Sequence, residues 1–137
     1  MLVSRDMDAG SSVLIVDDDP QVVAVMREYF QHEYANQGVL IRTASDGFAA
    51  LEALRASRPT LVLLDVEMPG QSGIDVLKEI RAIDPSLPVI MITGNETLSV
   101  AGQVMSRGAT AYLPKPVTFA YLDHIVSSVL TKKRLAH

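Results

Sequence analysis

The chain alternates between short apolar runs and longer segments in which apolar residues recur every three or four positions. The runs are three to five residues long and rich in β-branched residues, which predicts strands; they are residues 13–16, 39–43, 61–64, 89–92 and 111–113. The longer segments predict amphipathic helices; they are residues 20–34, 48–57, 73–83, 97–107 and 119–133. Helix N-caps are expected at Asp19, Ser72 and Thr118.

Five strands that alternate with five helices predict an α/β fold with one parallel sheet covered on both faces. The run at 39–43 is less apolar than the others, so we expect it near an edge of the sheet. If the strand order is 2-1-3-4-5, the first and third strands are neighbours, and ligands bind where their carboxyl ends meet. The expected class is therefore a doubly wound, five-stranded parallel sheet with flavodoxin-like order.

The composition is that of one globular domain. The sequence has 137 residues, 48% hydrophobic and 20% charged, with a net charge of −4. This acidic balance gives no reason to expect nucleic-acid binding, and the absence of cysteine excludes disulfides and thiolate metal sites. No apolar run approaches the ~20 residues that span a bilayer. We expect a flexible tail at 1–12, the domain at 13–131, and a tail or the start of a linker at 132–137.

Chemically active side chains follow the apolar strands. Asp17 and Asp18 follow the first strand, Asp65 the third, Thr93 the fourth and Lys115 the fifth. These strand ends share one edge of a parallel sheet, so we expect the side chains to converge. Three carboxylates in one place repel one another, and oxygen ligands without histidine or cysteine favour Mg²⁺ as the ion that relieves the repulsion.

This set of side chains has the parts that phosphoryl transfer needs. Asp65 is the expected nucleophile and would form an aspartyl phosphate. Mg²⁺, Thr93 and Lys115 would each stabilise one phosphoryl oxygen.

Four motifs stand in the order and spacing of a known family. They are Val16-Asp17-Asp18-Asp19-Pro20, Asp65-Val66-Glu67-Met68-Pro69-Gly70, Thr93-Gly94 and Tyr112-Leu113-Pro114-Lys115-Pro116. Over residues 13–130 the chain resembles CheY-like receiver domains of two-component response regulators. The resemblance implies a cytoplasmic protein that receives a phosphoryl group from a sensor histidine kinase or a histidine phosphotransfer protein.

The resemblance also implies roles for individual residues. Asp18, Asp65 and the backbone carbonyl of Glu67 would bind Mg²⁺, and Asp17 would act through water. Thr93 and Tyr112 would form a switch pair that changes the face made by the fourth helix, fifth strand and fifth helix; a fixed, half-buried core ring is the other interpretation of Tyr112. We leave open a homodimer through this face. The Lys115–Pro116 bond is expected to be cis.

Two positions flank the expected phosphoryl group and vary in the family, where they influence how fast the aspartyl phosphate hydrolyses. They are Glu67 and Asn95. Our hypothesis is that Glu67 pairs with Lys115 or reaches the metal shell in the resting state, so that the phosphorylated lifetime depends on it.

Two other functions compete with the signalling switch. A haloacid-dehalogenase-like phosphatase also uses a strand-end aspartate with Mg²⁺ and an acid two residues later, but its nucleophile usually follows the first strand. A pseudo-receiver that serves only as a scaffold would not need the full set of acids, hydroxyl and ammonium. We therefore expect a phosphoryl-accepting module without turnover of a small substrate.

Overall fold

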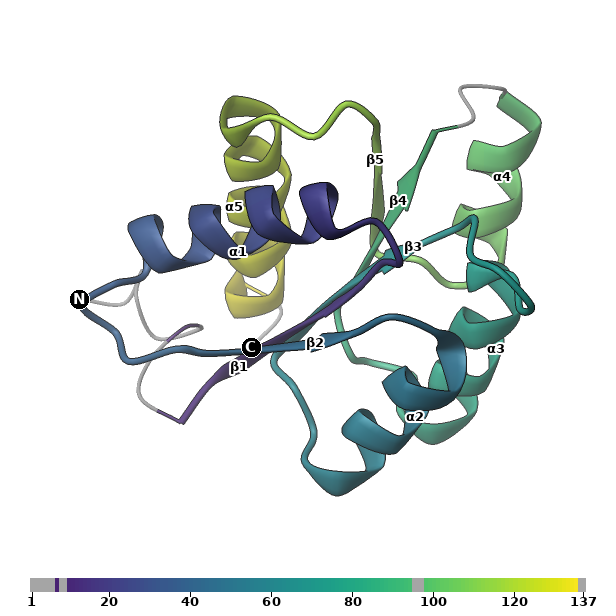
Figure 1. Cartoon of the computed structure of the whole chain (residues 1–137), viewed down its shortest axis with the longest axis horizontal. Helices are drawn as coiled ribbons and strands as arrows, with labels where there is room; N and C mark the ends of the chain where they lie inside the picture. Colours follow the sequence, from purple (N-terminus) through teal and green to yellow (C-terminus); the bar gives the residue numbers. More distant parts are fainter. Residues whose placement is uncertain (1–6, 8–9, 95–97, 136–137) are drawn as a thin grey trace.

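The computed structural model describes residue 7, residues 10–94 and residues 98–135. Within these, the five strands form one parallel sheet in the order β2-β1-β3-β4-β5, as predicted (Figure 1). The strands are β1 (Ser12–Val16), β2 (Leu40–Ala44), β3 (Leu61–Asp65), β4 (Val89–Thr93) and β5 (Ala111–Pro114). The less apolar β2 lies at an edge, which confirms the expectation drawn from its composition.

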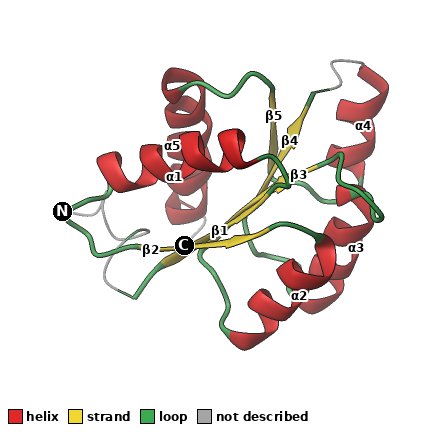
Figure 2. Ribbon diagram, in the orientation of Figure 1, coloured by secondary structure: helices red, strands yellow, loops and turns green. Residues whose placement is uncertain are grey.

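Helices connect the strands and cover both faces of the sheet, as Figure 2 shows. They are α1 (Pro20–Glu33), α2 (Gly47–Ala56), α3 (Gly73–Ile83), α4 (Leu98–Ser106) and α5 (Phe119–Leu135). Side chains of α1 and α5 share one core cluster with the sheet, and those of α2, α3 and α4 share the other. The chain therefore has the three layers expected of a doubly wound fold.

The central strands are apolar throughout because both of their faces are covered. In β1, Val13 and Ile15 face the α1–α5 side, whereas Leu14 and Val16 face the opposite side. All four residues are fully buried. This two-sided burial explains why the strands appear in the sequence as continuous apolar runs rather than as alternating patterns.

Local capping fixes the helix starts close to their predicted positions. Asp19 accepts a hydrogen bond from the Gln21 N–H (2.9 Å), and Ser72 accepts one from the Ile74 N–H (3.1 Å). The Thr118 hydroxyl accepts one from the Tyr121 N–H (3.3 Å). These three caps were predicted from the residue types alone.

The amino-terminal region differs in two details from the tail expected at residues 1–12. Strand β1 begins at Ser12, whose register partner is Leu40, and not at Val13. Met7 is 1% exposed and packs in the α1–α5 core cluster. Met7 is therefore part of the core, because burial of its long apolar side chain is more favourable than exposure to water.

Candidate functional site

The carboxyl ends of the strands bring the predicted polar side chains to one edge of the sheet. Asp65 and Thr93 are the last residues of β3 and β4, and Asp17 and Lys115 directly follow β1 and β5. Asp17, Asp65 and Thr93 are at most 2% exposed. Such burial is rare for aspartate and needs compensating partners.

Three carboxylates meet at this edge. One oxygen from each of Asp17, Asp18 and Asp65 lies within 4.8 Å of the others, and Asp18 alone of the three is exposed. The loop backbone holds the two buried acids in place, because Oδ1 of Asp17 accepts from the Asp19 N–H (2.9 Å) and Oδ1 of Asp65 from the Glu67 N–H (3.2 Å). The Oδ2 atoms of Asp17 and Asp65 are buried without a hydrogen-bond partner.

Lys115 is the cation that faces the two buried acids. Its Nζ lies 3.6 Å from Oδ2 of Asp17 and 3.5 Å from Oδ2 of Asp65, at ion-pair distance. Desolvation lowers the pKa of Lys115, but attraction to Asp65 and Asp17 outweighs this and raises it above its ordinary value. Lys115 is therefore charged at neutral pH.

The pKa of Asp65 responds to the same surroundings. Burial and the negative charge of Asp17 raise it to about 6, while the Glu67 N–H and Lys115 act in the opposite direction. The Lys115 ammonium group thus does not fully offset the effects of burial and of repulsion between the two carboxylates on the pKa of Asp65.

The donor set fits Mg²⁺. All the ligand atoms on offer are carboxylate oxygens, which hard divalent cations prefer, and the described residues bring no histidine or cysteine into the cluster. The two buried oxygens without hydrogen bonds are positions where a cation would supply the missing partner. Asp17, Asp18 and Asp65 are the side chains that would hold it.

The chain matches the response regulator receiver domain family over residues 13–127. It belongs to this family. Response regulators act in two-component signal transduction, so the chain contains a receiver domain of such a system.

Two relatives of this chain are described as transcriptional regulators. NtrC of Escherichia coli is 38% identical over 125 residues, which are 91% of this chain and 25% of that protein. TcrX of Mycobacterium tuberculosis, described as a probable transcriptional regulatory protein, is 36% identical over 105 residues, covering 77% of this chain and 43% of its own length. The chain thus spans less than half the length of these two curated relatives.

Solved structures agree with the fold. NtrX of Brucella abortus superposes with a TM-score of 0.84 at 30% identity, covering 92% of this chain and 28% of that one. A CheY-like receiver domain protein from Methanospirillum hungatei gives a TM-score of 0.83 at 24% identity, covering 93% and 98% of the two chains. No match supports the haloacid-dehalogenase-like alternative, and Asp65 follows the third strand rather than the first.

The remaining predicted residues of the receiver domain take distinct positions. Thr93 is buried, Tyr112 on the neighbouring strand is 36% exposed, and the Lys115–Pro116 peptide bond is cis. Asn95 lies outside the described residues.

Glu67 does not make the ion pair with Lys115 that was one of the two contacts expected from the sequence. The structure describes both Glu67 and Lys115 and gives no ion pair between them; Lys115 instead pairs with the two buried acids. The Glu67 side chain lies outside the cluster of three carboxylates, and its reach to a metal shell stays a prediction. Its Oε1 accepts a hydrogen bond from the backbone N–H of Gly94 (3.2 Å), because the loop after β3 directs the side chain toward β4.

Gly73 supports the site and was not singled out from the sequence. A Cβ on Gly73 would lie 2.0 Å from the backbone oxygen of Asp65, far closer than any van der Waals contact. The Gly73 N–H also donates to the Val66 carbonyl (2.7 Å). The first turn of α3 therefore packs directly on the backbone that carries Asp65. The available signal was a glycine immediately after the Ser72 cap.

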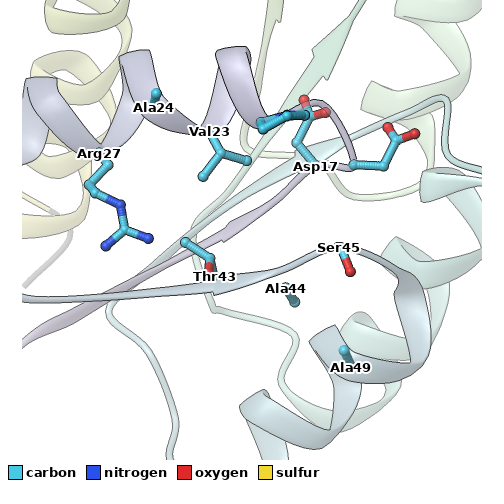
Figure 3. A pocket seen from close by; sticks show the side chains of 10 residues that line it. Asp17, Val23, Ala24, Arg27, Thr43, Ala44, Ser45 and Ala49 are labelled. Atoms are coloured by element: carbon cyan, nitrogen blue, oxygen red, sulfur yellow. The ribbon is translucent and has the colours of Figure 1, made fainter.

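A cavity of about 650 Å³ adjoins the acids on the side of α1 and β2. Asp17 and Asp18 line one part of it, and Figure 3 shows Arg27 reaching from α1 toward Thr43 at the other end. This cavity gives solvent a route to the acidic cluster. Among the described residues, no helix is both long and apolar enough to span a membrane.

Proposed function

We propose that this receiver domain accepts a phosphoryl group on Asp65 from a phosphohistidine of a sensor histidine kinase or a histidine phosphotransfer protein. The observation that carries the proposal is the meeting of three carboxylates and one ammonium group at a single edge of the sheet. A buried structural ion pair would need one acid and one base, whereas this site has an excess of acid.

The transfer makes one bond and breaks one. The P–N bond of the phosphohistidine breaks, a P–O bond to the Asp65 carboxylate forms, and the imidazole leaves with the bonding electron pair. Mg²⁺, when bound, supplies the positive charge that offsets the crowded oxygens. We assign its side-chain ligands to Asp18 and Asp65, with the Glu67 carbonyl as a further ligand and Asp17 acting through water.

Side chains on the neighbouring strands would stabilise the transferred group. Lys115 Nζ already lies 3.5 Å from Asp65 and would follow the negative charge onto a phosphoryl oxygen. Thr93 ends the strand beside that of Asp65, and its hydroxyl would donate to another oxygen.

We further propose that Thr93 and Tyr112 transmit phosphorylation to the surface. Movement of the Thr93 hydroxyl toward the phosphoryl group would leave space that the half-exposed ring of Tyr112 fills. The face of α4, β5 and α5 would then change shape, because the added charge favours one of two conformations of this surface. Met105, Phe119 and Tyr121 are already exposed on these helices, and a second copy or an effector domain would bind there.

Intact-mass measurement after incubation with acetyl phosphate and Mg²⁺ tests the proposal. The wild type should gain one phosphoryl mass, and Asp65→Asn should gain none. Asp75→Asn, which alters an exposed acid on α3, is the matched control and should behave as wild type. Chelation of Mg²⁺ should abolish the gain. A wild type that stays unmodified, or an Asp65→Asn variant that is modified equally, would overturn the assignment.

We also propose that the domain works in the cytoplasm and turns over no small substrate beyond loss of its own phosphoryl group. Over a time shorter than the lifetime of the aspartyl phosphate, incubation with p-nitrophenyl phosphate and Mg²⁺ should release no more than one equivalent of nitrophenol per chain. Multiple turnovers would contradict this part of the proposal.

A further inference from the structure

The carboxylate of Glu67 joins two loops that flank Asp65. Glu67 lies in the loop between β3 and α3, and its Oε1 accepts from the N–H of Gly94, which follows β4 (3.2 Å). A Cβ on Gly94 would lie 3.6 Å from this oxygen and 3.9 Å from Cδ of Lys115. The anionic side chain of Glu67 therefore rests on a backbone donor at the edge of the site, and Gly94 lies between this carboxylate and the Lys115 side chain.

The strand register places this donor at the edge of the sheet where Asp65 ends β3. Asp65 is aligned with Ile92 on β4, so Thr93 and Gly94 extend one and two residues beyond Asp65 at the carboxyl edge. A group attached to the Asp65 carboxylate projects outward from the same edge. Thr93, which ends β4, and Gly94, which follows it, are the residues of this neighbouring segment that extend past Asp65. In the unphosphorylated structure, the Gly94 N–H already donates its hydrogen bond to Glu67.

We propose that Glu67 is a built-in competitor of the phosphoryl group. Its carboxylate accepts the hydrogen bond of the Gly94 N–H. It also adds negative charge at the edge of the sheet where the phosphoryl group, which is more highly charged, would be attached to Asp65. Phosphorylation therefore has to displace Glu67, and the displacement breaks the link between the β3–α3 loop and the start of the β4–α4 loop. This inference rests on the proposed phosphorylation of Asp65.

The size of the effect follows from Coulomb's law. Two unit charges about 6 Å apart, in an effective dielectric of about 40 between protein surface and water, interact strongly enough to change a rate roughly tenfold. Glu67 is exposed, so this higher dielectric is the appropriate one. Neutralising Glu67 should therefore speed phosphorylation by roughly tenfold at low salt, and less at high salt.

Two variants separate charge from hydrogen bonding. Glu67→Gln keeps an oxygen that can accept from Gly94 but removes the charge, whereas Glu67→Ala removes both. Glu79→Gln is the matched control, because Glu79 is an exposed acid bonded to Gln71 of the same loop (3.1 Å) and not to Gly94. Rates of phosphorylation by acetyl phosphate with Mg²⁺ are read by intact mass, and the Gly94 amide resonance is read by NMR without phosphate.

The proposal expects faster phosphorylation of both Glu67 variants, with Glu79→Gln at the wild-type rate. It also expects the Gly94 amide resonance to shift in Glu67→Ala much more than in Glu67→Gln. Equal rates in wild type and both variants, or an unmoved Gly94 resonance in Glu67→Ala, would overturn it. A wild type that takes no phosphoryl mass would instead refute the proposed function, while the resonance of Gly94 would still report the contact.

Discussion

Replacing Asp65 by asparagine should make the metal-free domain more stable at neutral pH, although it removes the proposed phosphorylation site. Asp65 is 1% exposed and lies beside a second buried acid, Asp17. Asparagine keeps the oxygen that accepts from the Glu67 N–H and replaces Oδ2, which has no hydrogen bond and lies 3.5 Å from Lys115 Nζ, with an uncharged amide group. The variant therefore relieves the repulsion without leaving a cavity.

The magnitude follows from the pKa of Asp65, which is raised from 3.8 to about 6 in the folded state. At about 1.4 kcal/mol per pH unit, this difference corresponds to about 3 kcal/mol of destabilisation by the ionised group. Solvent near the edge of the site screens part of it, so about 1–2 kcal/mol is the expected gain for Asp65→Asn. For a domain of this size the gain is roughly 3–8 °C in Tm.

The pH dependence has a definite sign. Because the folded state holds the Asp65 proton more tightly, the wild type loses stability as the pH rises from about 4 to about 6. The stability gap between Asp65→Asn and wild type should thus be widest above pH 6 and nearly absent below pH 4. Mg²⁺ should stabilise the wild type by mass action and close the gap.

Urea unfolding followed by circular dichroism, with chelator or with Mg²⁺, measures these differences. Glu52→Gln, which neutralises an exposed acid on α2, controls for the change in net charge and should show no such gap. The reasoning is refuted if Asp65→Asn is no more stable than wild type in chelator at neutral pH. It is also refuted if the gap does not change with pH.

Two further substitutions probe the supports of the site, and a third probes the packing of α1 against α5. Lys115→Ala removes the cation beside Asp65, so Mg²⁺ should bind more tightly by calorimetry while phosphorylation by acetyl phosphate slows at least tenfold; unchanged values for both would contradict the ion-pair geometry. Gly73→Ala places a methyl group against the Asp65 backbone and should cost about 2–4 kcal/mol in urea unfolding, with a near-wild-type value as the contrary result. Tyr29→Phe loses the hydrogen bond to Asp123 (2.7 Å) between α1 and α5 and should cost about 1–2 kcal/mol, whereas no loss would show that this bond is replaced by water.

Much of the fold could be predicted because each strand carries its own signal. A run such as Leu61–Asp65 is apolar on both faces, and this occurs where helices cover both sides of a parallel sheet. Parallel strands end at the same edge, so the sequence predicted that Asp17, Asp65 and Lys115 lie along it. Their close approach also depends on the strand order, which entered the prediction as a condition and which the structure confirms.

Other features depend on geometry that no local pattern encodes. Glu67 was expected to contact Lys115 or the metal shell, yet its direction is set by two loops whose relative position only the folded chain fixes. The close approach of Gly73 to Asp65 is likewise a contact between a helix start and a strand end. Met7 joins the core from outside any regular element, so no periodicity marks it.

The net charge of the side chains at the carboxyl edge of the sheet links the metal site, the proposed phosphorylation and Glu67. If all are ionised, Asp17, Asp18, Asp65 and Lys115 sum to two negative charges, which one divalent cation neutralises. Phosphorylation replaces the single charge of Asp65 with about two. The metal-bound edge then has an excess negative charge. Among the described residues, Glu67 is an exposed anion that lies outside the metal cluster and is held to the β4 end by one hydrogen bond. Its side chain can therefore move away at little cost. Its displacement would release Gly94 beside Thr93, on the segment that leads into α4.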